Sequence, residues 1–232
     1  MSDPVKQDLR AARVAETETR ILRAAVELFL ENGYAGTTLT AVAERAGVGH
    51  RTLYVRFGTK AALLKRAVDV AFVGDTEPVD VRGRPWFALA LTAPTAAERI
   101  EALAVGGRLM MERAGDILAV ALEAGAVEPD LAAAAQAARE ATRENISAFW
   151  SRMDDDGLVP PGSDLAWLTD TTTILVHAET YLLSRKMIGW DANGYERWLV
   201  TTLTRLLAGT RPDQENALPG RHDGGRSEGG QT

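Results

Sequence analysis

Residues 47–57, GVGHRTLYVRF, place several side chains that can bind anions directly after a glycine-containing turn. They are His50, Arg51, Thr52, Tyr54 and Arg56. The stretch is too polar for a core segment and too aromatic for an ordinary solvated turn. A helix that begins at His50 would carry cations at its N-terminus, where the helix dipole disfavours them by roughly 0.3–1 kcal/mol unless an anion lies opposite. Phosphate groups bind well at helix N-termini, so the stretch predicts contact with a nucleic acid.

The chemistry divides into base contacts and backbone contacts. Arg51 could reach O6 and N7 of guanine, and Val55 could touch a thymine methyl group. Tyr54 lies one turn along on the same outward face, where its hydroxyl can bond a phosphate. Thr38 and Lys60 begin the helices on either side and are expected to hold the DNA backbone. With Gly49, the predicted DNA-binding residues are Thr38, Gly49, His50, Arg51, Thr52, Tyr54, Val55, Arg56 and Lys60.

The elements that position these residues are short helices. The sequence predicts a helix over 16–32, a second capped by Thr38 and ending near Ala46, a third over 50–57, and a fourth over 60–73. The second and third are joined by a tight glycine turn, which is typical of a helix-turn-helix. The second helix of such a unit lies in the DNA major groove with its N-terminal residues facing the bases.

The rest of the chain also follows a helical period, and no segment alternates with the period of a strand. The expected helices cover 86–91, 96–124, 129–153, 163–188 and 192–207, after a linker-like stretch at 74–85. We therefore predict an all-α protein: an N-terminal helix-turn-helix domain over 14–60, joined by a fourth helix to a ligand-binding and dimerisation domain over 61–208. Residues 1–13 and 209–232 are expected to be disordered.

Composition limits the possible functions. The 232 residues carry a formal charge of -6, but residues 1–74 hold 11 Lys/Arg against 8 Asp/Glu. The N-terminal segment is therefore net basic, and the rest of the chain is net acidic. There is no cysteine, no apolar run of membrane-spanning length and no signal-peptide pattern, so we expect a cytoplasmic protein with no membrane contact. The three aspartates at 154–156 could bind a hard cation, but a solvated helix end is the favoured interpretation. No nucleophile–base pair or phosphate loop is present, so we predict no enzyme, no metal and no cofactor.

The stretch TTLTAVAERAGVGHRTLYVRFGTKAALL resembles the DNA-binding domain of the TetR (tetracycline-repressor-like) family of bacterial regulators. The likeness covers about residues 16–72. It implies an all-helical homodimer that binds a palindromic operator on double-stranded DNA, with a small effector in the larger domain. It assigns phosphate contacts to Thr38, Thr52, Tyr54 and Lys60. The chain departs from the family pattern at Gly49, Arg51, Val55 and Arg56, so base recognition is expected to be its own.

Two groups of residues in the larger domain are candidates for the effector and the dimer. His177 would either line a pocket or be a satisfied core or interface histidine. On the helix expected over 163–188, we expect one stripe of side chains to line the pocket and another to contact the partner copy. The predicted pocket residues are Trp86, Leu103, Gly107, Met110, Phe149, Asp170, Ile174, His177 and Tyr181. The predicted dimer residues are Leu168, Thr172, Leu175, Glu179, Leu182, Trp198, Leu199 and Leu206.

The sequence thus favours a DNA-binding transcriptional regulator, most simply a repressor released by an apolar or aromatic effector. An activator or an architectural DNA-binding protein without effector release is the alternative. An internal cavity would favour regulation, and a fully packed large domain would favour an architectural role.

Overall fold

The computed structural model describes residues 4–73 and 81–209, which form helices and connecting turns with no strand among them. The all-α prediction is confirmed. The helices are α1 (Pro4–Gly36), α2 (Leu39–Ala46), α3 (His50–Phe57), α4 (Lys60–Val73), the 3₁₀ helix η1 (Val81–Gly83), α5 (Pro85–Thr92), α6 (Ala96–Ala124), α7 (Pro129–Asp155), α8 (Leu165–Val176), α9 (Ala178–Ile188) and α10 (Ala192–Gly209).

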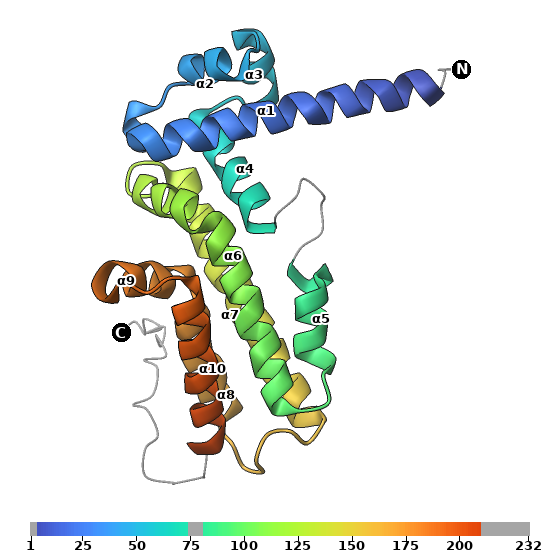
Figure 1. Ribbon diagram of the computed structural model, residues 1–232, viewed down its shortest axis with the longest axis vertical. Helices are drawn as coiled ribbons and strands as arrows, with labels where there is room; N and C mark the ends of the chain where they lie inside the picture. Colours follow the sequence, from blue (N-terminus) through green and yellow to red (C-terminus); the bar gives the residue numbers. More distant parts are fainter. Residues whose placement is uncertain (1–3, 74–80, 210–232) are drawn as a thin grey trace, which may run out of the picture.

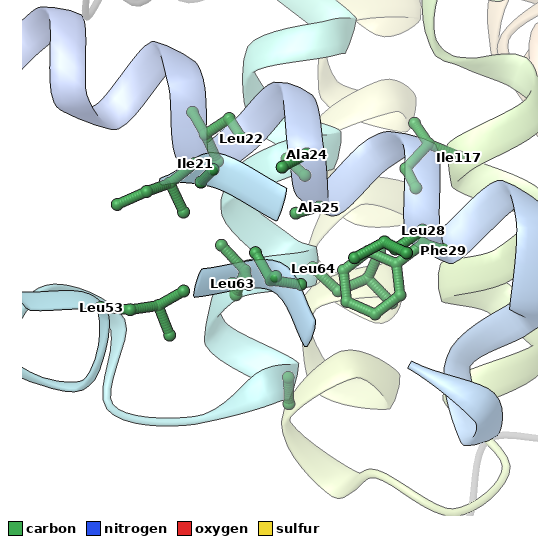
Figure 2. Close-up of a cluster of buried hydrophobic side chains, with 14 of the residues drawn as sticks. Ile21, Leu22, Ala24, Ala25, Leu28, Phe29, Leu53, Leu63, Leu64 and Ile117 are labelled. Atoms are coloured by element: carbon green, nitrogen blue, oxygen red, sulfur yellow. The ribbon is translucent and has the colours of Figure 1, made fainter. Parts of the chain in front are cut away.

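The first four helices form the upper part of the molecule (Figure 1). α2 and α3 lie on one side of α1, and α4 descends from them toward the larger part. Their shared core includes Phe29 of α1, Leu53 of α3 and Leu64 of α4, each with no exposed surface. Ile117 of α6 belongs to the same cluster (Figure 2). The N-terminal core is therefore continuous with the end of α6.

Local sequence signals explain how α2 and α3 begin and end. The Thr38 hydroxyl accepts a hydrogen bond from the Ala41 amide at 3.1 Å and caps α2. Gly47 then adopts φ 64° and ψ 40°, a left-handed conformation that costs glycine little. The amide of Val48 donates to the Ala43 carbonyl at 3.0 Å and closes the turn. α3 follows at once, so the glycine turn sets the angle between the two helices.

The larger part is arranged around α6, which packs against α1, α4, α5, α7, α9 and α10. A capping box starts it, since the Thr95 side chain accepts from the Glu98 amide and the Glu98 carboxylate accepts from the Thr95 amide. α7 packs against α8, and the indole of Trp150 donates to the Thr172 hydroxyl at 3.0 Å in the core. In Figure 1, α6 and α7 form a long pair with α5 on one side and α8 and α10 on the other.

The structure corrects several expected boundaries. α1 begins at Pro4, so residues 4–13 are helical where we expected a loose arm. α10 includes Gly209, and the expected disorder of 210–232 lies outside the described residues, as does 74–80 of the expected linker. The single helix expected over 163–188 is two helices, because His177 has φ -70° and ψ 145° and ends α8. Within the described ranges, no helix has the length and apolarity to span a membrane.

Candidate nucleic-acid interface

The outer face of α3 presents most of the predicted DNA-binding residues to solvent. Tyr54 and Val55 are 53% and 78% exposed, unusual values for large side chains. The seven exposed members of the predicted set are Thr38, Gly49, His50, Arg51, Thr52, Tyr54 and Val55. In the described part of the chain, the side chains of His50 and Arg51 have no hydrogen-bond or ion-pair partner. This face is therefore available for an external acceptor.

α3 itself is attached to the domain by few contacts. Leu53 is its only buried residue, and Phe57 is partly buried against the same core. Gly49 at the N-cap supplies no side-chain hydrogen bond. The Thr52 amide donates to the Gly49 carbonyl at 2.9 Å. The amides of His50 and Arg51 are left for water or for a phosphate oxygen, as at other anion-binding helix ends.

Arg56 and Lys60 differ from the other seven because both are half-buried and engaged within the protein. Arg56 forms an ion pair with Glu18 of α1. The Lys60 ammonium donates to the carbonyls of Tyr34 at 2.7 Å and Thr37 at 2.9 Å and lies 4.1 Å from the centre of the Tyr34 ring. An ammonium has three N–H groups, so one of them remains for a phosphate.

A hydrogen bond also links this domain to the turn between α6 and α7. The Tyr34 hydroxyl donates to the Glu128 carboxylate at 2.7 Å. Burial and this carboxylate both raise the pKa of Tyr34, so the hydroxyl keeps its proton across the physiological range. The turn of the larger domain is therefore attached directly to the end of α1.

Sequence reasoning missed Glu18 and Arg66. The Glu18 carboxylate is only 15% exposed, and its two oxygens accept from Arg56 of α3 and, at 2.9 Å, from Arg66 of α4. Burial acts to raise the pKa of Glu18, but the hydrogen bonds and charges of the two arginines outweigh it, and the pKa is lowered. No local pattern could reveal this contact, because the three residues lie on three different helices.

The predicted pocket residues do not surround one common space. Leu103 and Phe149 belong to one buried cluster, whereas Tyr181 belongs to another, against which Met110 packs. Gly107 is buried, and the half-buried Trp86 covers the neighbouring Gly106.

Three further members of the set lie elsewhere. Asp170 pairs with Arg143 at 2.8 Å, and Ile174 is 66% exposed, so both face outward and the prediction for them is wrong. His177 caps α9, with Nδ1 accepting from the Glu179 amide at 3.4 Å. Burial lowers the pKa of His177, which favours the neutral ring that such an acceptor requires.

Two grooves on the surface of the described residues are lined by none of the predicted pocket residues. One is apolar and lies between the start of α6, the α7–α8 connection and the end of α10. The other lies between α6 and α9 and includes Asp116 and Arg185, which pair at 2.6 Å.

Part of the predicted dimer set also needs correction. Leu168, Thr172 and Leu199 are completely buried within one protomer and cannot touch a partner copy. The stripe of α8 that holds Leu168 and Thr172 faces α7, where the Trp150 indole donates to the Thr172 hydroxyl. Glu179 is exposed and pairs with Arg139, and Leu175, Leu182, Trp198 and Leu206 are half-buried.

Residues 21–67 match the model of the bacterial regulatory proteins of the tetR family. In this region the chain is similar to the regulators of the tetR family. The match spans α1 to α4 and includes all nine residues of the predicted DNA-binding set.

The chain also has relatives in sequence and in fold. The HTH-type transcriptional regulator TcmR of Streptomyces glaucescens is 34% identical over 79 residues, which are 33% of this chain and 35% of that protein. The chain thus matches about a third of the length of this curated relative.

Solved structures share the fold over most of both chains. SmeT in complex with triclosan has a TM-score of 0.63 at 18% identity, covering 82% of this chain and 90% of that one. Native NalD of Pseudomonas aeruginosa, the secondary repressor of the MexAB-OprM multidrug efflux pump, has a TM-score of 0.58 at 22% identity, covering 83% and 96%. These similarities show that the larger domain shares the fold of these proteins.

Proposed function

We propose that this protein is a homodimeric repressor of the tetR family, which binds a palindromic operator and is released from it by a small apolar or aromatic effector. The observation that carries the proposal is the solvent-facing surface of α3, with His50 and Arg51 at a helix N-terminus that has no side-chain cap. NalD, a repressor of similar fold, adds support. Such a role places the protein in the cytoplasm, with the chromosome.

The proposed contacts follow from position on α3. Arg51 and His50, at its first turn, read base edges in the major groove, and Val55 contacts a thymine methyl group. Thr52 and Tyr54 bind phosphates and set the position of the helix on the duplex. Thr38 and the third N–H of Lys60 hold the backbone on either side of α3. Gly49 leaves the first amides of the helix accessible to a phosphate.

A second copy of the chain is proposed to bind an outward patch on α8 and α9. The patch consists of Ile174, Leu183, Met187 and Ile188, which are 66%, 55%, 73% and 61% exposed. Leu183 and Met187 are four residues apart and share one face of α9. Exposed apolar side chains on a shared face mark interaction sites more often than scattered ones do. Leu175, Glu179, Leu182, Trp198 and Leu206 remain candidates for the rim of this interface.

Arg51→Ala should lower affinity for the operator about tenfold and relax the base preference at one position in each half-site, because a guanidinium bound to guanine is removed. The measurement is selection of bound sequences from random duplexes, followed by titration of the selected operator. Tyr54→Phe is the control, since loss of a phosphate contact weakens binding to all sequences alike. If the selected sequence and the affinity are unchanged in Arg51→Ala, this arginine does not read bases.

Effector release is proposed from the resemblance in fold to SmeT, which has been solved with triclosan. An apolar effector would enter beside Trp86, Leu103 and Phe149, which belong to one cluster of packed side chains. Because these side chains pack closely in the structure, entry would have to open the space between them. Triclosan and other aromatic compounds of one to three rings, titrated into the protein–operator complex, should release the DNA. Fluorescence anisotropy of a labelled operator measures this release.

The close packing also favours a second candidate function, an architectural or activating DNA-binding protein without effector release. The Trp86 indole lies directly on the backbone of Gly106, at the place where we expected the pocket. If aromatic compounds neither release the operator nor raise the melting temperature of the protein, this second candidate is preferred.

A further inference from the structure

Glu18 connects three helices of the N-terminal domain. It lies on α1, and its two carboxylate oxygens accept from Arg56 on the recognition helix α3 and from Arg66 on α4. The side chains of Arg56, Glu18 and Arg66 are 27%, 15% and 38% exposed, so the group is partly shielded from solvent. Hydrogen bonds between ionised partners in such a setting are stronger than those between neutral groups.

α3 depends on contacts of this kind for a defined orientation. It has eight residues, a single buried side chain and no side-chain cap at its N-terminus. Isolated helices of this length are marginal in water, so tertiary contacts must hold it. Leu53 holds its inner face, and Arg56, near its last residue, is the side chain that ties it to α1 through an ion pair.

We propose that Glu18 is a positioning residue, which holds α3 in the orientation needed to read DNA, and that Arg56 acts through Glu18 rather than by contacting bases. This inference rests on the proposed DNA-binding function. It also replaces the expectation that Arg56 takes part in base recognition, because its guanidinium is turned inward to a carboxylate of its own chain.

The same carboxylate couples α3 to the larger domain. α4 packs on both α1 and α6, and it carries Arg66. A movement of α4 that draws Arg66 away leaves one Glu18 oxygen without its partner and weakens the hold on α3. Glu18 therefore transmits the position of α4 to the recognition helix, without a direct contact between Arg66 and the DNA.

Glu18→Gln in the full-length protein tests the hold on α3, with Glu27→Gln as the matched control. Both changes remove one negative charge from α1, but Glu27 pairs with Arg45 of α2, at 3.2 Å. Hydrogen exchange of the α3 amides in the free protein is the first readout. Glu18→Gln should speed it about tenfold, as the loss of one charge-assisted hydrogen bond implies, and the control should not. Arg66→Gln should also speed it, although this side chain belongs to α4.

Discrimination between operator and scrambled duplex is the second readout, and a double-mutant cycle separates the two roles of Arg56. Glu18→Gln and Arg56→Gln should each lower the affinity ratio about tenfold, and the double variant should be no worse than either, because both act through one contact. If Arg56→Gln lowers the ratio further in the Glu18→Gln background and relaxes one base position, Arg56 reads bases and the inference is overturned.

The two proposals fail in different ways. If the wild-type protein selects no DNA sequence, the proposed function fails, and the exchange measurement alone then decides whether Glu18 positions α3. If the α3 amides exchange equally fast in Glu18→Gln and Glu27→Gln, the inference is overturned, whether or not the protein binds an operator.

Discussion

Replacing both Leu183 and Met187 by aspartate is expected to convert the protein to a monomer and to weaken operator binding by about 10²–10⁴-fold. The two residues are four apart on α9, share one face and are 55% and 73% exposed. Carboxylates there would have to be buried against a partner copy, which is costly without a compensating charge. A monomer holds one half-site at a time and loses the gain in affinity that comes from joining two binding modules.

Sedimentation velocity and operator titration at the same protein concentration measure the two effects. Leu89→Asp is the control, because Leu89 is exposed to a similar extent, 53%, on α5, away from the patch. A double variant that remains a dimer would exclude the α9 patch as the interface. A variant that becomes a monomer yet binds the operator as before would contradict the two-half-site mechanism.

Gly106→Ala is expected to destabilise the protein by about 3 kcal/mol, the upper part of the range for overpacked cores. A Cβ on Gly106 would lie 2.1, 2.2 and 2.6 Å from Cε3, Cδ2 and Cζ3 of the Trp86 indole. Such distances are far below van der Waals contact, so the indole would have to leave its place on α6. Urea denaturation, followed by the far-ultraviolet circular dichroism of the helices, measures the change in unfolding free energy.

Gly107→Ala is the matched control on the same helix. Its new Cβ would lie 3.8 Å from Cδ1 of Leu199, an ordinary contact, and alanine is a better helix former by up to about 1 kcal/mol. We therefore expect Gly106→Ala to lower the free energy of unfolding and Gly107→Ala to raise it. In the Gly106→Ala background, Trp86→Leu should restore much of the lost free energy of unfolding. If Gly106→Ala alone leaves the free energy of unfolding unchanged, the Trp86 indole is free to move. That result would favour the opening of a pocket between Trp86 and α6.

Features that depend on near neighbours in the chain were predictable from the sequence. Thr38 was expected to cap a helix, and its hydroxyl accepts a hydrogen bond from the amide three residues ahead. Thr59 and Thr95, which directly precede α4 and α6, do the same. The same local chemistry placed Pro129 in the first turn of α7. Gly107 was expected in the pocket, but Gly106 beside it was a signal that sequence reasoning did not use. Glycine is costly inside a helix, so a close packing partner was to be expected.

Contacts between distant segments could not be predicted in this way. The helical period shows which residues of α8 share a face, but not which face meets α7. Leu168 and Thr172 were therefore expected at the partner copy, whereas both are buried within the protomer. The break at His177 shifts the phase of every residue after it. Its side chain replaces a helical neighbour as the hydrogen-bond acceptor for the α9 amide of Glu179.

The stretch GVGHRTLYVRF by itself determined that a short helix follows a glycine turn and which of its side chains share the outward face, because turn conformation and helical period are local properties. Only the tertiary structure decided that Arg56 is turned inward to Glu18 and that Lys60 is engaged by the carbonyls of Tyr34 and Thr37. The partner of a charged side chain depends on how separate helices pack, and local sequence patterns do not encode that arrangement.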